Sequence, residues 1–137
     1  MNEYMKSALL IIITSVFMMA SSCHKHDPDT VDNEVTITIN KPAAAETVNV
    51  SGINIEIVYE AISLTHDIEI RIYPKNDPSE ILYSHSEHLH RKTATVTKSA
   101  SITGYPAGTE FILETTACID LNCELPKATK SVNFFQM

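Results

Sequence analysis

Residues 53–59 read Ile-Asn-Ile-Glu-Ile-Val-Tyr, and residues 68–73 read Ile-Glu-Ile-Arg-Ile-Tyr. In both stretches isoleucine recurs at every second position, and polar or charged residues stand between the isoleucines. Successive side chains of a β-strand point to opposite faces, so this period of two predicts a strand with one buried face. We therefore expect two half-buried strands in the middle of the chain.

Further strands are expected on both sides of this pair. Residues 35–40 show the same alternation, which Lys41-Pro42 ends because proline cannot donate to a strand ladder. Shorter or weaker strand patterns follow at residues 48–50, 81–86, 93–103, 109–118 and 128–135. Seven or eight short strands, with turns between them and no helical period, predict an all-β fold: a single antiparallel β-sandwich over residues 34–137.

Residues 102–117 read Ile-Thr-Gly-Tyr-Pro-Ala-Gly-Thr-Glu-Phe-Ile-Leu-Glu-Thr-Thr-Ala. This stretch resembles the region of strands E and F in fibronectin type III and related immunoglobulin-like domains. In that family a Pro-x-Gly-Thr corner leads into a strand that begins with an aromatic residue and ends near an alanine. Here Phe111 stands where the family usually has a tyrosine, and the chain has no tryptophan. The resemblance implies an immunoglobulin-like β-sandwich.

The N-terminus carries a short apolar run behind a cationic residue. Lys6 precedes the run at residues 8–20, which is shorter than the roughly 20 apolar residues needed to span a bilayer. Such a segment is typical of a secretory signal. Its end, Ala20-Ser21-Ser22-Cys23, resembles the lipobox of bacterial lipoproteins. The resemblance implies that residues 1–22 are a cleaved signal peptide and that Cys23 carries the lipid.

A lipid on Cys23 would anchor the protein in the cell envelope of a Gram-negative bacterium, and we expect the outer membrane. Residues 23–33 are polar, contain Pro28 and lack an apolar period, so they are interpreted as a flexible tether. The formal net charge is -7. Nucleic acids and anionic lipid headgroups are bound by clusters of Lys and Arg, so an acidic chain is a poor candidate to bind either of them. Membrane attachment should therefore come from the lipid on Cys23. Expected partners are proteins or glycans, and nucleic acid is not expected.

The chain contains three cysteines. With Cys23 taken by the lipid, Cys118 and Cys123 remain as an even pair in an oxidising compartment. Cysteines on facing strands of a hairpin meet the separation that a disulfide requires. We therefore predict a Cys118–Cys123 disulfide, worth about 2 kcal/mol for so short a loop. The alternative is a metal-binding or redox pair, although a redox site usually has Cys-x-x-Cys spacing.

Residues 84–90 read Ser-His-Ser-Glu-His-Leu-His, which places His85, His88 and His90 close together in the chain. On a straight strand His88 and His90 share a face and His85 points away. A turn or bulge near Glu87 would bring all three imidazoles together, where they could hold a copper, zinc or nickel ion. The alternative interpretation is a solvated loop between two strands, in which these histidines are simply polar residues.

Catalysis is not expected. The sequence contains no Ser-His-Asp arrangement, no glycine-rich phosphate loop and no Gly-x-Ser-x-Gly elbow, and it has only three glycines.

Glycan binding commonly uses a row of exposed aromatic residues, and here Tyr83 and Tyr105 are the freer candidates. We therefore predict an envelope-anchored lipoprotein with a non-catalytic binding or structural domain and no cofactor apart from the lipid. The alternatives are a copper- or zinc-binding protein that uses the histidine-rich segment, and a glycan-binding module.

Overall fold

The computed structural model describes residues 35–120, 123 and 128–137. The predicted signal peptide at 1–22, the lipid acceptor Cys23 and the tether at 23–33 lie outside the described residues. The described part of the chain contains no helix of the length and hydrophobicity needed to cross a membrane.

The described residues form six strands and one short 3-10 helix. These are β1 (Val35–Lys41), β2 (Glu46–Val48), η1 (Val50–Gly52), β3 (Ile53–Pro74), β4 (Tyr83–Ala100), β5 (Glu110–Ala117) and β6 (Ala128–Gln136). The all-β prediction is confirmed. The strands are fewer and longer than the sequence indicates, because β3 spans 22 residues and β4 spans 18.

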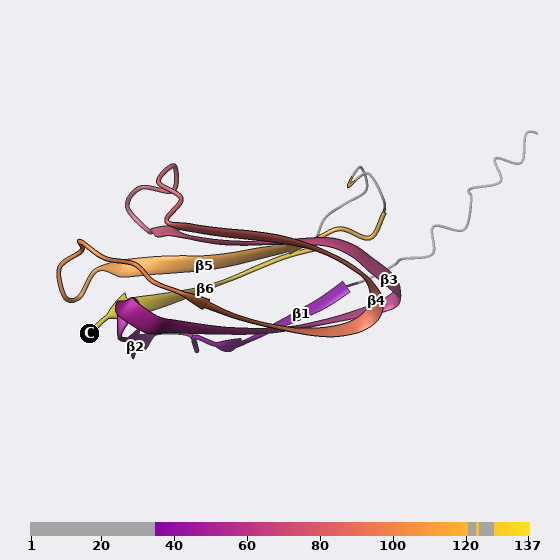
Figure 1. Ribbon diagram of the computed structural model, residues 1–137, viewed down its shortest axis with the longest axis horizontal. Coiled ribbons are helices and arrows are strands. Elements are labelled where there is room, and N and C mark those ends of the chain that lie inside the picture. The colour runs from indigo at the N-terminus through magenta and orange to yellow at the C-terminus, as the bar shows by residue number, and fades with distance from the viewer. Residues whose placement is uncertain (1–34, 121–122, 124–127) are drawn as a thin grey trace, which may run out of the picture. The chain divides into compact units, whose positions relative to one another are not determined.

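The long strand β3 contains both isoleucine-rich stretches that were expected as separate strands. Its pairing with β4 changes register between Glu60 and Thr65, and again between Thr65 and Asp67. Such irregularities bend a strand and increase its twist. Figure 1 shows the consequence: β3 and β4 run together along one layer, curl at one end, and return along the other layer.

All six strands belong to one hydrogen-bonded sheet in the order β1-β3-β5-β6-β2, with β4 also paired to β3. The first half of β3 pairs with β1 and with the second half of β4. Its second half pairs with β5 and with the first half of β4. The pairs are antiparallel except β2 with β6, which is parallel and departs from the wholly antiparallel arrangement expected from the sequence.

The core lies between the two layers of this curled sheet. Ile55 and Ile57 from the first half of β3, and Ile70 and Ile72 from the second half, are all 0% exposed. Burial of each such side chain stabilises the fold by about 1.5–3 kcal/mol relative to an exposed position. The isoleucine alternation in the sequence therefore marks the buried face of β3 in both layers.

Candidate metal centre

The region where β3 and β4 curl between the layers carries three histidines. In the ladder Thr65 pairs with Arg91 and Asp67 pairs with His88, so one residue of β3 lies opposite two residues of β4. The extra residue on β4 makes a bulge. His90 within it has a positive φ of 49°, a conformation that is uncommon for residues other than glycine.

The bulge brings His90 close to His66 of β3 and His88 of β4. One ring nitrogen from each of the three histidines lies within 4.8 Å of the other two. The Nδ1 atoms of His66 and His90 are 3.4 Å apart. Two nitrogens that bind one tetrahedral zinc ion at 2.0–2.1 Å lie about 3.3 Å from each other. The separation of these two nitrogens, which also allows a hydrogen bond between the rings, is close to that of two ligands of one zinc ion.

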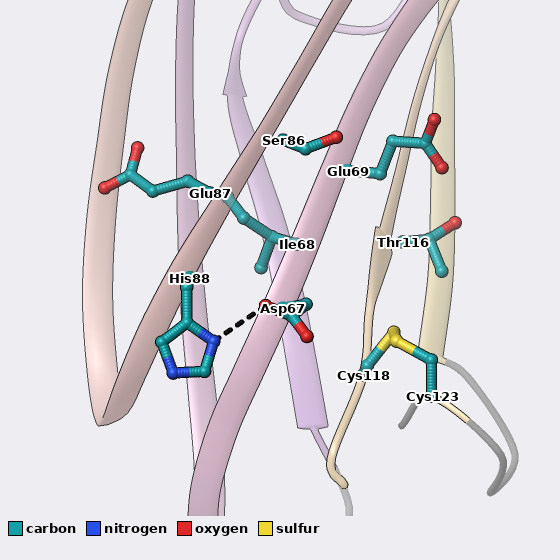
Figure 2. A pocket seen from close by; sticks show the side chains of 9 residues that line it. All are labelled: Asp67, Ile68, Glu69, Ser86, Glu87, His88, Thr116, Cys118 and Cys123. Atoms are coloured by element: carbon teal, nitrogen blue, oxygen red, sulfur yellow. Dashed lines mark hydrogen bonds and ion pairs between the residues drawn. A yellow bond between two sulfur atoms is a disulfide. The ribbon is translucent and has the colours of Figure 1, made fainter. Parts of the chain in front are cut away.

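Asp67 orients the third imidazole. The Nδ1–H group of His88 donates to Oδ1 of Asp67 at 2.7 Å, as the dashed line in Figure 2 shows. An ionised carboxylate is only an acceptor, so the proton resides on Nδ1 and Nε2 of His88 is left for a metal ion. Metal-binding histidines commonly donate their other ring N–H to a carboxylate in this way.

His85, which was predicted to join His88 and His90, lies on the other face of β4. In the ladder it is opposite the fully buried Ile70, and its Nε2 is 3.1 Å from a carboxylate oxygen of Glu87. Glu87 also contacts Lys98 at 3.0 Å. Hydrogen bonds from His85 and then from Lys98 hold the pKa of Glu87 below its usual range. The structure thus joins His88 and His90 with His66, and His85 takes part in a separate ion-pair cluster.

The histidines at 85, 88 and 90 belong to strand β4 and not to a loop between strands. His66 was not predicted as a ligand from the sequence, because it comes from a different strand, β3. His66 and His90 are 24 residues apart in sequence. A local pattern could not reveal this pairing, although the neighbouring Asp67 is a residue type often found beside metal-binding histidines.

A disulfide joins Cys118, which directly follows β5, to Cys123, with the two Cα atoms 5.1 Å apart. This confirms the pairing predicted from the sequence. Cys118 is hydrogen-bonded through its main chain to the segment that carries the metal-site residues. Its N–H donates to the Asp67 carbonyl at 2.7 Å, and its carbonyl accepts from the His66 N–H at 2.9 Å.

A surface depression of about 340 Å³ separates the disulfide from the histidine site. Figure 2 shows Asp67 and His88 on one side of it and Cys118 with Cys123 on the other. Glu69, Ser86 and Thr116 also line it.

The two tyrosines considered for glycan binding are packed against the core. The Tyr105 ring meets the Phe111 ring edge-on, with centroids 5.2 Å apart. A hydrogen bond to Glu80 raises the Tyr105 pKa to about 12. Tyr83 is half-buried against the core, and burial raises its pKa. Both rings are partly exposed, so a stacking role for them in glycan binding stays a prediction.

No protein-family model matches the chain, and no curated protein matches it. Among solved structures it is similar to the crystal structure of wild-type OgpA from Akkermansia muciniphila, with a TM-score of 0.50 and 15% sequence identity. The similarity covers 73% of this chain and 27% of the OgpA chain, so this chain spans little more than a quarter of OgpA. At this level of identity, the likeness concerns the fold alone.

Proposed function

We propose that this chain binds a divalent transition-metal ion, copper or zinc, on a non-catalytic domain held at the bacterial cell envelope. The observation that carries the proposal is the set of three imidazoles, from His66, His88 and His90, whose ring nitrogens lie within 4.8 Å of one another. Imidazole is a ligand suited to zinc, copper and nickel. For the same site, the usual order of divalent affinities favours Cu²⁺ over Zn²⁺.

The site is supported by its surroundings as well as by its ligands. His66 is half-buried, and its main-chain N–H donates a hydrogen bond to the Cys118 carbonyl. The ring of His88 is fixed by Asp67. Both strands that supply ligands are paired with each other on either side of the bulge. A site whose ligands are held in advance loses less conformational freedom when the ion binds.

We propose further that the domain is an immunoglobulin-like sandwich. One layer then comprises β1, the first half of β3 and the second half of β4. The other comprises β2, β6, β5, the second half of β3 and the first half of β4. This grouping of the strands into two layers supports the proposal, and the parallel pair of β2 with β6 is the exception to its antiparallel pairing.

The corner before β5 also supports this fold. Thr109 bonds the Pro106 carbonyl through its N–H and its hydroxyl, at 3.2 and 2.7 Å. Gly108 has a φ of 82°, which favours glycine. Phe111, the aromatic residue at the start of the following strand, is 0% exposed.

Isothermal titration of the purified protein with Zn²⁺ and with Cu²⁺ tests the metal site. The wild type should bind one ion with a dissociation constant in the micromolar range or below. His66→Asn should weaken binding at least tenfold, since it removes one of three ligands. His85→Asn is the matched control, because His85 lies in the same segment but faces away, and it should bind as the wild type does.

Two results would contradict the metal site. One is the absence of saturable binding by the folded wild type at micromolar metal. The other is a loss of affinity in the His85→Asn protein as large as that in His66→Asn. Far-UV circular dichroism of each variant checks that the strands are retained.

The anchor is part of the same proposal and has its own test. The lipobox-like ending at residues 20–23 supports a lipid on Cys23 and residence at the outer membrane. Mass spectrometry of the membrane-extracted protein should find acyl groups on Cys23, and Cys23→Ser should move the protein to the soluble fraction. Equal membrane attachment of the Cys23→Ser protein would refute the anchor and leave the metal site untouched.

A further inference from the structure

The disulfide and the histidine site share one piece of backbone. The register between β3 and β5 runs as far as Ile68 opposite Ala117. Beyond it, the main chain of Cys118 adds two more hydrogen bonds, from its N–H to the Asp67 carbonyl and from the His66 N–H to its own carbonyl. Cys118 is therefore hydrogen-bonded to the main chain of two neighbouring residues. One is the proposed ligand His66, and the other is Asp67, whose carboxylate orients His88.

The covalent bond to Cys123 fixes Cys118 at this place. β5 ends at Ala117, and the disulfide joins the next residue, Cys118, to Cys123, five positions further along the chain. A short closed loop restricts the chain at the end of the ladder, where strands otherwise fray. With the bond intact, the last two hydrogen bonds hold residues 66 and 67 against β5.

We infer that the redox state of the Cys118–Cys123 pair sets the metal affinity of the three-histidine site. This inference rests on the proposed metal-binding function. Reduction removes the covalent bond that holds Cys118 in place, so its hydrogen bonds to His66 and Asp67 open more often. The His66 ring and the Asp67 carboxylate then lose their fixed positions, and the ion binds more weakly.

The reaction is an ordinary thiol–disulfide exchange with an external dithiol. A thiolate of the dithiol attacks the sulfur of Cys123, forms a mixed disulfide and releases Cys118 as a thiolate, which takes up a proton. The second thiol of the dithiol then displaces Cys123, which leaves the protein with two thiols and the dithiol oxidised. Cys123 is partly exposed and borders the 340 Å³ depression, which gives the reductant access (Figure 2).

The coupling must act in both directions. If the oxidised protein binds the ion more tightly than the reduced protein, the bound ion favours the oxidised protein by the same factor. Loss of a group that orients a metal ligand typically weakens binding 10- to 100-fold. A tenfold difference corresponds to a shift of about 30 mV in the midpoint potential of this two-electron couple.

Zinc is the probe, because it has no redox chemistry of its own. The first measurement compares Zn²⁺ binding by the oxidised wild type with binding by the Cys118→Ser/Cys123→Ser double variant, which lacks both the bond and free thiols there. We expect the double variant to bind about tenfold more weakly. The second measurement is the midpoint potential of the wild-type disulfide in a dithiol/disulfide buffer. Saturating Zn²⁺ should make it more negative by about 30 mV.

The two measurements separate this inference from the function on which it rests. If the oxidised wild type does not bind Zn²⁺, the proposed function itself fails. If the oxidised wild type binds Zn²⁺ and the dissociation constant of the double variant is within threefold of the wild-type value, the coupling is refuted. The coupling is also refuted by a midpoint that does not move, or that becomes more positive because the freed thiols ligate zinc. The midpoint uses the wild type only, so it decides the matter even if the double variant does not fold.

Discussion

The hydroxyl of Tyr59 meets the hydroxyl of Thr115 at 2.5 Å between the two layers, and both residues are fully buried. Thr115 donates its only hydroxyl proton to the Glu69 carbonyl at 2.9 Å. Tyr59 must therefore be the donor to Thr115. The two hydrogen bonds form a directional chain that links the first half of β3 to β5 and then to the second half of β3.

This direction predicts unequal costs for the two obvious substitutions. Tyr59→Phe removes one hydrogen bond but leaves no donor without an acceptor, so it should lower the free energy of unfolding by about 1 kcal/mol. Thr115→Val leaves the buried hydroxyl of Tyr59 without a partner and should cost about 2–3 kcal/mol. Urea unfolding followed by circular dichroism measures both. Equal costs would mean that Tyr59 is not the donor.

Tyr59 should also make the stability of the fold decrease at alkaline pH. Burial raises the pKa of Tyr59 from 10.0 to about 12. Between these values the unfolded chain has lost the proton while the folded chain keeps it, so raising the pH favours unfolding. The contribution of Tyr59 is thus complete below pH 10 and is lost as the pH rises towards 12.

Urea midpoints measured at intervals from pH 9 to about pH 12 test this dependence. The Tyr59→Phe protein should lose less stability over this range than the wild type. Some loss should remain in the variant, because Tyr105 also has a pKa raised to about 12. Parallel curves for the two proteins would contradict the assignment to Tyr59.

Among the strands, β4 is one of those that lie at an edge of the curled sheet. Among the described residues β4 pairs only with β3, so the other side of an 18-residue strand is open. Open edges invite pairing with other chains, and inward-pointing charged side chains are one way in which proteins prevent it. Glu87 and Lys98 lie opposite the buried Ile68 and Ile55 in the ladder, and their charged atoms are 3.0 Å apart.

We therefore expect the Glu87→Val/Lys98→Val double variant to self-associate through this edge. Size-exclusion chromatography with light scattering should show larger species whose share grows with protein concentration. Ser84→Val/Ser86→Val is the matched control, because these exposed residues lie on the opposite face of the same strand. If the control associates as strongly, added surface hydrophobicity and not the loss of edge charges is the cause.

For the whole molecule, the proposed metal ion should stabilise the fold by mass action. The ligands come from two strands, and the unfolded chain does not hold them together, so the ion binds mainly the folded state. Free Zn²⁺ at 100 times its dissociation constant should raise the free energy of unfolding by about 2.7 kcal/mol. Thermal unfolding with and without Zn²⁺ measures this as a higher melting temperature.

Two histidine variants and a lower pH serve as controls for the stabilisation by zinc. His88→Asn should reduce the zinc-dependent rise, and His85→Asn should keep it in full. Lowering the pH should shrink the rise, because protons compete with the ion for the same ring nitrogens. A rise of equal size in the His88→Asn protein would show that zinc stabilises the fold from another place.

The alternation in the sequence was sufficient to predict an all-β chain and the buried face of each half of β3. Ile55, Ile57, Ile70 and Ile72 were assigned to inward faces by their period of two, and all four are fully buried. The alternation is sufficient for this because it reports which side chains share a face, a property of each strand alone. The spacing of Cys118 and Cys123 likewise determined their pairing, since so short a segment keeps both within reach of each other.

Tertiary packing was needed to show that the two isoleucine stretches belong to one strand and that His66, not His85, joins His88 and His90. Both outcomes depend on the register between β3 and β4, which shifts near Thr65 and again at the bulge that contains His90. A residue's partner across a ladder is set by where such shifts fall along both strands. The period of a single strand carries no information about that position, because side chains far apart in sequence meet only once both layers have packed.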